Sequence, residues 1–238
     1  MSEDRPGFED TPSLPDGEYR VHDPDRPHPP RVDPGGTVRM PPPSDAETLF
    51  DGGDLAGWEA DEGDEPPWRV EDDELVIEPG TGDLRTTTGL GDCQLHVEWA
   101  TPADPGDARY PGNSGVFLAD RYELQVLDCH ETTIYADGYT GAIYGQHPPL
   151  ANACLPPGAW QSFDVLWHGP TFDDGELVSP ASITAFHNGV LIHDGAEPHG
   201  PTTYRDVQPY EPHGPAPLRL QDHGFPVRFR NIWYRPLD

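Results

Sequence analysis

Short runs in which apolar and polar residues alternate recur through most of the chain, and this period of two is typical of β-strands with one buried face. In the run from Cys93 to Trp99, for instance, Leu95, Val97 and Trp99 share one face, and polar residues occupy the other. The same pattern predicts strands at 68–77 with a turn at 72–73, 114–118, 122–128, 160–167, 181–186, 190–194, 217–221 and 227–234.

Turn signals separate these predicted strands. The pair Asn188-Gly189 lies between two of them and is a strong hairpin signal, because both residues tolerate the left-handed backbone of a tight turn. Segments rich in Pro and Gly fill other connections, and the sequence contains neither a long amphipathic helical pattern nor a repeat. We therefore predict an all-β fold, a jelly-roll β-sandwich of short strands.

The first 45 residues differ from the rest, since they are rich in Pro, Asp, Arg and Gly and poor in aliphatic side chains. Such a segment buries too little apolar surface to form a core of its own. We predict an extended, partly disordered N-terminal arm over residues 1–45, in which 19–23 lies along the body. The jelly-roll domain is predicted over residues 46–238.

The predicted strand at 122–128 carries the most informative polar face. If its apolar residues meet the core, Glu123 and Gln125 stand side by side on the opposite face. A carboxylate and an amide on neighbouring rungs can bridge sugar hydroxyls, and the carboxylate can also move a proton. A strand face that is simply exposed to solvent is the alternative interpretation.

A second group of polar side chains near the C-terminus favours a binding groove over an exposed face. It consists of Gln221, Asp222, His223, Arg228 and Arg230. Further candidates for contacts with sugar hydroxyls are Asn113, Asp128, Tyr144, Gln146, Asn152 and His187. His187, His223 and Glu123 are also candidate ligands of a divalent metal ion, because imidazole and carboxylate groups bind such ions, although no metal-binding spacing is present.

The pattern disfavours a conventional glycosidase. A retaining glycosidase needs two carboxylates about 5–5.5 Å apart. Glu123 and residue 125 have roughly that separation along one strand face, but position 125 is Gln, and an amide cannot act as a nucleophile. A retaining mechanism would require the carboxylate of Asp128 or Asp222 to lie close enough to Glu123 to act as the second carboxylate.

The composition of the chain bears on its binding partners and on its location in the cell. The formal net charge is −29 and every basic residue is Arg, which argues against nucleic acid and anionic membranes as partners. The three cysteines, Cys93, Cys129 and Cys154, have no metal-binding spacing and are expected to be buried and reduced. The N-terminal sequence shows no apolar stretch of the kind found in export signals or membrane spans, so a cytoplasmic location is expected.

Several short motifs, taken in their order along the chain, resemble the 3-keto-disaccharide hydrolase family. They are Leu49–Gly52, Asp54-Leu55, Gly57-Trp58, Gly82–Leu84, Asn113–Leu118, Tyr122–Asp128, Gly141–Tyr144, Trp160-Gln161, His187–Gly189, Gly200–Thr202, Leu220–Gly224 and Arg230–Ile232. The resemblance extends from about residue 46 to the C-terminus, and the arm segment 19–23 resembles the lead-in of some members.

The resemblance implies a jelly roll of the concanavalin A-like lectin and glucanase type that acts on glycosides already oxidised to a ketone at C3. A functional link to a sugar 3-dehydrogenase is therefore expected. A ketone at C3 acidifies the proton on C2, so a base can remove it and form an enolate. The group at C1 then leaves by elimination, and addition of water gives net hydrolysis of a small 3-keto-glycoside.

This chemistry needs a base, a group that stabilises the enolate and an acid for the leaving oxygen. Glu123 is expected to be the base, with His223 as the less favoured choice. Arg228 or Arg230, with or without a divalent metal ion, would stabilise the enolate, and Asp222 or His223 would protonate the leaving group.

Three other functions remain open at this point. A lectin-like module would use the same groove to bind carbohydrate without catalysis. A conventional glycoside hydrolase would need a second carboxylate opposite Glu123. A domain that only accompanies oxidoreductases in complexes is the third alternative.

The acidic composition predicts adaptation to a salt-rich cytoplasm. Self-repulsion among the acids is tolerated there, because charges are screened within about 3 Å at roughly 1 M salt. Melting the protein across a series of potassium chloride concentrations should show a melting temperature that falls in dilute buffer. A melting temperature that stays constant would contradict the hypothesis.

Overall fold

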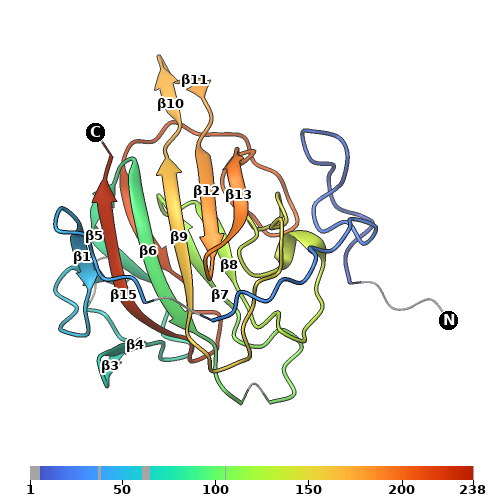
Figure 1. Cartoon of the computed structure of the whole chain (residues 1–238). Helices are drawn as coiled ribbons and strands as arrows, with labels where there is room; N and C mark the ends of the chain where they lie inside the picture. Colours follow the sequence, from blue (N-terminus) through green and yellow to red (C-terminus); the bar gives the residue numbers. More distant parts are fainter. Residues whose placement is uncertain (1–5, 37–38, 61–64, 105, 238) are drawn as a thin grey trace.

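A computed structural model describes residues 6–36, 39–60, 65–104 and 106–237 of the chain. Two antiparallel sheets pack face to face in it (Figure 1). The larger sheet has the order β13-β12-β9-β6-β15-β4-β3, and β1 also pairs with β15. Its strands are β1 Glu47–Phe50, β3 Arg69–Glu71, β4 Glu74–Val76, β6 Cys93–Ala100, β9 Gln161–His168, β12 Ser182–His187, β13 Val190–Ala196 and β15 Arg228–Pro236.

The smaller sheet has the order β2-β5-β14-β7-β8. Its strands are β2 Trp58–Glu59, β5 Leu84–Leu90, β7 Ser114–Leu118, β8 Tyr122–Val126 and β14 Ala216–Leu220. A separate ribbon of β10 Thr171–Asp173 and β11 Glu176–Ser179 projects beyond the larger sheet (Figure 1). No helix in the described part of the chain is long and apolar enough to cross a bilayer.

One apolar core lies between the two sheets and confirms the predicted all-β sandwich. Trp99 and Trp167 reach it from the larger sheet, and Leu124 and Leu220 reach it from the smaller one. The central strands contribute alternate residues to this core, because successive side chains point to opposite faces of a sheet. The alternate residues of the smaller sheet are therefore free to build a site on its outer face.

The predicted strands agree with the observed ones to within a few residues, and the hairpin at 188–189 is confirmed. Asn188 has φ 52° and Gly189 has φ 79°, the left-handed values that a tight β12–β13 turn requires. Five strands were not predicted from the sequence, namely β1, β2, β5, β10 and β11. In β5 the run of three threonines hides the alternation, although Thr86 is buried and its neighbour Thr87 is exposed.

The described part of the N-terminal arm is bound to the body by specific contacts. Val21 and His22 are fully buried. The backbone amide of His22 donates to Asp137 Oδ2 at 2.8 Å, and its Nδ1 lies 3.0 Å from Asp137 Oδ1. Asp137 belongs to a short 3-10 turn at Ala136–Gly138. The hydroxyl of Thr11 donates to the Val21 carbonyl at 2.6 Å, so the arm also folds back on itself.

The outer face of the larger sheet carries a buried ion pair. The Glu98 carboxylate accepts hydrogen bonds from Arg230 Nε and Asn231 Nδ2, both at 2.7 Å, and its side chain is only 1% exposed. The Met40 carbonyl accepts hydrogen bonds from Asn231 Nδ2 at 2.8 Å and Trp233 Nε1 at 3.1 Å, which ties the arm to β15. Burial acts to raise the pKa of Glu98, but hydrogen bonds from His96, Asn231 and Arg230 together lower it to about 2.

Replacing Arg230 by Met should leave Glu98 buried without its cation. Because the folded pKa of Glu98 lies below its ordinary value, the pair stabilises the fold above about pH 4.5, and this contribution is lost as the pH falls toward 2. We expect Arg230→Met to lower the free energy of unfolding by about 3 kcal/mol at pH 7 and by much less near pH 2. Urea unfolding at both pH values measures this.

Arg235→Met is the matched control for Arg230→Met. Arg235 pairs with Asp45 at 2.6 Å in an exposed position on the same strand, so its loss should cost much less stability than the loss of Arg230. If the two variants lose equal free energies of unfolding, the buried Arg230–Glu98 pair does not contribute more to stability than the exposed Arg235–Asp45 pair.

Candidate functional site

A pocket of about 320 Å³ opens on the face of the smaller sheet that turns away from the core. Side chains of β7, β8 and β14 form its floor, and the loops at 144 and 202–204 form its wall. Its lining residues are Asn113, Phe117, Glu123, Gln125, Tyr144, Thr202, Thr203, Tyr204, Arg219, Gln221 and His223. Six of the candidate site residues predicted from the sequence meet here: Asn113, Glu123, Gln125, Tyr144, Gln221 and His223.

A second hollow of about 440 Å³ lies beside β1 and contains none of the predicted site residues. Its three acids already have partners close by. Glu47 accepts from the Tyr234 hydroxyl at 2.8 Å, while Asp51 and Asp54 accept from the backbone amides of Gly53 and Ala56. The two aspartate bonds close local turns, and the Glu47 bond joins β1 to β15, so the pocket on the smaller sheet is the stronger candidate site.

Strand alternation places the two central residues of the pocket. The Tyr122, Leu124 and Val126 side chains enter the core, so Glu123 and Gln125 face the pocket, as the period of two predicts. Gly115 lies opposite Gln125 on β7, and a Cβ atom there would come within 2.7 Å of Glu123 Oε1. Glycine at position 115 therefore leaves the space that the Glu123 carboxyl group occupies.

The Glu123 carboxyl group is buried without a direct partner. The residue is 5% exposed, and within the described residues no hydrogen bond or ion pair reaches its carboxyl oxygens. Burial raises the pKa of Glu123 to about 8; the charge of Arg219 opposes this rise and that of Asp83 adds to it. The backbone is fixed by a 3.0 Å hydrogen bond from the Glu123 amide to the Thr202 hydroxyl.

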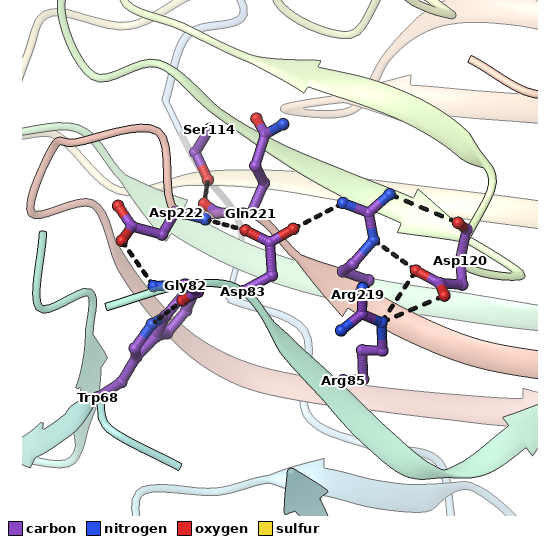
Figure 2. A network of polar contacts seen from close by, with 9 residues as sticks. All are labelled: Trp68, Gly82, Asp83, Arg85, Ser114, Asp120, Arg219, Gln221 and Asp222. Carbon is purple, nitrogen blue, oxygen red and sulfur yellow. Dashed lines mark hydrogen bonds and ion pairs between the residues drawn. The ribbon is translucent and has the colours of Figure 1, made fainter. Parts of the chain in front are cut away.

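Two aspartates hold Arg219 in place (Figure 2). Arg219 lines the same pocket as Glu123, and its charge acts on the Glu123 carboxyl group. Its Nη1 donates to Asp83 Oδ2 at 2.7 Å, and its Nε forms an ion pair with Asp120, which also binds Arg85 at 3.2 Å. The guanidinium lies 3.5 Å from the centre of the Phe117 ring. These contacts fix a cation at the pocket floor, where its position does not depend on a bound ligand.

Asp222 fastens the loops next to the pocket and does not line it. Its Oδ2 accepts hydrogen bonds from the backbone amides of Gly80, Thr81 and Gly82 at 2.6, 2.9 and 3.1 Å, and its Oδ1 accepts one from Gly224 at 2.8 Å. Both carboxylate oxygens are therefore engaged. The backbone of the neighbouring Gln221 is also engaged: its carbonyl accepts from the Ser114 hydroxyl at 2.7 Å, and its amide donates to the Gly115 carbonyl at 3.0 Å. The Gln221 side chain lines the pocket.

An aromatic cluster supports the wall of the pocket. The Tyr144 and Tyr135 hydroxyls are hydrogen bonded at 2.7 Å, and burial raises the pKa of both phenols, so they remain neutral donors. The buried His22 ring of the arm lies 3.9 Å from the Tyr135 ring and 5.0 Å from the Tyr144 ring, measured between centres. The arm thus packs directly behind a residue of the pocket.

Gln125 leaves one polar atom without a partner. Its Oε1 is buried and accepts no hydrogen bond from the residues that the structure describes. An unpaired buried acceptor is costly, and a donor delivered by a ligand hydroxyl would relieve that cost. This feature favours a polyhydroxylated ligand at the floor.

The remaining predicted site residues lie elsewhere. Arg228 pairs with Glu74 at 2.8 Å and Arg230 with Glu98, both on the larger sheet beside Trp160. Three others bind the backbone instead of lining the pocket: Asp128, Gln146 and Asn152.

His187 lies in the core rather than in the pocket. Its Nε2 is 2.9 Å from Gln161 Oε1, its ring stacks on Trp99, and burial lowers its pKa to about 3. The three proposed metal ligands, Glu123, His187 and His223, are therefore not brought together. Among the described residues, no group of three or more His, Cys, Asp and Glu side chains is arranged to hold a metal ion.

Sequence reasoning missed five pocket residues as candidates for the site: Phe117, Thr202, Thr203, Tyr204 and Arg219. A signal for Arg219 was available, since the predicted strand at 217–221 puts it on the same face as Gln221. Phe117 likewise follows from alternation in the predicted strand at 114–118. Tyr204 lies in an irregular loop that has no periodicity to mark it.

Comparison with known proteins gives one family and several structural neighbours. The sequence profile of the 3-keto-alpha-glucoside-1,2-lyase-like domain matches residues 45–235. No curated protein matches the chain.

The solved structures that resemble the chain include crystal structures of candidate glycosyl hydrolases from Parabacteroides distasonis ATCC 8503. One is 37% identical with a TM-score of 0.79, and the match covers 95% of this chain and all of that one. A second is 24% identical with a TM-score of 0.59, and the match covers 80% of this chain and 93% of that one. The first match includes most of the N-terminal arm, because it leaves only 5% of this chain uncovered.

The raised pKa of Glu123 predicts a stability cost that depends on pH. The folded pKa of Glu123, about 8, lies above its ordinary value of 4.5, so the neutral carboxyl group is favoured in the folded state. Its contribution to stability is complete below about pH 4.5 and is lost as the pH rises through 8. Glu123→Gln does not titrate, so its stability relative to the wild type should increase between pH 5 and pH 8.5. Urea unfolding at these two pH values measures the change.

Glu176→Gln is the control for the titration of Glu123, because Glu176 is an exposed glutamate of β11. This variant should follow the wild type at both pH values. If the free energies of unfolding of Glu123→Gln and the wild type differ by the same amount at both pH values, the Glu123 carboxyl group does not titrate in this range.

Proposed function

The chain belongs to the 3-keto-alpha-glucoside-1,2-lyase-like family, and we propose that it cleaves the glycosidic bond of 3-keto-glycosides by elimination. One observation carries the proposal: among the described residues that line the pocket, Glu123 is the single acid. The pocket otherwise offers amides, hydroxyls, aromatic rings, a cation and an imidazole. Elimination next to a ketone requires one base, whereas conventional glycoside hydrolysis requires two carboxyl groups.

Glu123 is the proposed base. It removes the proton from C2, which the neighbouring ketone at C3 has made acidic, and the electron pair moves into an enolate. A carboxylate with a pKa near 8 is a stronger base than an ordinary glutamate. Only a minor fraction of it is ionised at neutral pH, and that fraction grows as the pH rises through 8. The residue is only 5% exposed, which limits how much bulk water reaches the carboxylate.

The enolate oxygen needs a positive or hydrogen-bonding partner. Arg219 takes the role that the sequence suggested for Arg228 or Arg230, because it is the arginine that lines the pocket with Glu123. The neutral Tyr144 hydroxyl, supported by Tyr135, is a second donor at the same wall. Donors that are fixed before the reaction stabilise developing charge with little reorganisation.

Bond cleavage follows from collapse of the enolate. The C1–oxygen bond breaks, a double bond forms between C1 and C2, and the leaving oxygen takes up a proton. His223 is the proposed acid, because it lines the pocket and is exposed to solvent, which can restore its proton. Asp222 is not assigned this step, since four backbone amides occupy its oxygens. Addition of water across the double bond completes a net hydrolysis.

The ketone at C3 has to be installed before the chain can act. Oxidation of a hydroxyl to a ketone requires a redox enzyme, and none of the proposed residues carries out redox chemistry. A functional link to a sugar 3-dehydrogenase therefore remains part of the proposal.

Glu123→Gln should abolish turnover of 3-keto-trehalose and of a 3-keto β-glucoside. Removal of a general base lowers rates by roughly 10²- to 10⁴-fold. In the wild type, kcat/KM should rise with pH and level off above about 8, as the Glu123 carboxyl group ionises. Chromatography of the products should show 3-keto-glucose or the unsaturated 3-keto sugar.

Glu176→Gln, in the exposed ribbon, should retain wild-type rates and serves as the matched control. Full activity of Glu123→Gln would rule out the proposed base. Binding of these sugars without turnover by the wild type would favour a lectin-like module, and turnover of the unoxidised disaccharides would favour a conventional hydrolase.

A further inference from the structure

The pocket has a deep end and an exposed rim. Gln125 is 2% exposed and Glu123 is 5% exposed, so both lie at the floor. Tyr204 lines the same pocket and is 66% exposed, which places its ring at the rim. This gradient gives a bound ligand a direction, with one part enclosed by the Glu123 carboxyl group and the Gln125 amide and another part next to an aromatic ring.

The Tyr204 ring is supported from behind by the N-terminal arm. Its centre lies 6.4 Å from the Phe8 ring in an edge-to-face arrangement and 6.1 Å from the His22 ring. The guanidinium of Arg205 covers Phe8 at 3.9 Å and forms an ion pair with Asp10, so the Tyr204 loop and the arm are joined by charge as well.

The loop itself is constrained on both sides of Tyr204. The Thr202 amide donates to the Arg121 carbonyl at 2.8 Å, and the Thr203 hydroxyl donates to the Asp206 carbonyl at 2.9 Å. Arg205 adopts a left-handed backbone with φ 58°. An exposed aromatic ring that is held in this way loses little conformational freedom when a ligand packs on it.

The proposed elimination fixes which end of the substrate reaches the rim. Glu123 must contact the hydrogen on C2, so the oxidised ring has to lie at the floor. The bond that breaks starts at C1, the carbon next to C2, and the leaving group therefore extends away from the floor. The open direction of the pocket is the rim, where Tyr204 lies.

We propose that Tyr204 forms a platform for the leaving group and selects substrates whose leaving group is itself a ring. The inference rests on the proposed elimination, because that reaction sets the orientation of the substrate. A sugar ring has one face lined with C–H groups, and an aromatic ring covers such a face while its hydroxyls stay in water. A second sugar or an aromatic alcohol fits this requirement, and a small alkyl alcohol does not reach the ring.

Kinetics with two substrates test the platform. The protein would be assayed with 3-keto-trehalose, which has a sugar leaving group, and with methyl 3-keto-α-glucoside, whose leaving group is methanol. Tyr204→Ala should raise KM for 3-keto-trehalose by roughly three- to tenfold, with little change in kcat, and leave the methyl glycoside almost unaffected. Tyr204→Phe should behave as the wild type, because the ring is retained.

Leu150→Ala is the matched control for the loss of an exposed apolar side chain, since Leu150 is 58% exposed and does not line the pocket. It should change neither KM. An equal effect of Tyr204→Ala on both substrates, or no effect on either, would overturn the platform.

Calorimetry separates this inference from the proposed reaction. The titration uses the Glu123→Gln protein with and without Tyr204→Ala, and both 3-keto sugars as ligands. A loss of affinity for 3-keto-trehalose alone, caused by Tyr204→Ala, would support the platform. Failure of the wild type to cleave either substrate would refute the proposed elimination and leave this binding result standing. Unchanged affinity for 3-keto-trehalose would refute the platform.

Discussion

Burial of the Glu123 carboxyl group is the constraint on which the rest of the site depends. Three apolar residues of β8 must enter the core, and the period of two then turns Glu123 and Gln125 to the opposite face. The absence of a side chain at Gly115 lets the carboxyl group lie flat against β7. Since no described residue donates to that group, its ionised form is destabilised, and the same property makes it a stronger base.

The surroundings of Glu123 keep that property intact. Arg219 would lower the pKa of Glu123 further if it were unpaired, but Asp83 and Asp120 neutralise much of its charge. The same ion pairs fix β14 relative to β5 and to the β7–β8 turn (Figure 2). Tyr144 forms part of the opposite wall, and Tyr135 and the arm pack behind it, so a segment that looks unstructured by composition supports the pocket from outside. Stability and reactivity are thus set by one group of contacts around a single acid.

The sequence predicted those parts of the fold and the site that depend on local alternation, and it did not predict those that depend on contacts between distant segments. Alternation identified most strands and the Glu123–Gln125 face, because a period of two is a local property of the sequence. It could not tell which sheet a strand joins, so Arg228 and Arg230 were grouped with the groove although they pair with Glu74 and Glu98 on the other sheet.

Other features of the site depend on contacts between distant segments. Asp222 was predicted to be a catalytic acid, whereas it accepts hydrogen bonds from the backbone of Gly80–Gly82. The sequence could not show this role, because it exists only once two distant loops meet. Arg219 could have been found by alternation, whereas the rim residue Tyr204 depends on packing against an arm almost two hundred residues away.

The central claim is that the C2 proton is removed, and labelling that position tests it most directly. The protein would be given 3-keto-trehalose with deuterium at C2 of the oxidised ring in ordinary water, and the released keto sugar analysed by mass spectrometry. A parallel incubation of the labelled product alone corrects for spontaneous exchange. Elimination predicts that the deuterium is lost at the rate of bond cleavage. Release of a keto sugar that retains its deuterium would contradict the account, because direct displacement at C1 leaves C2 untouched.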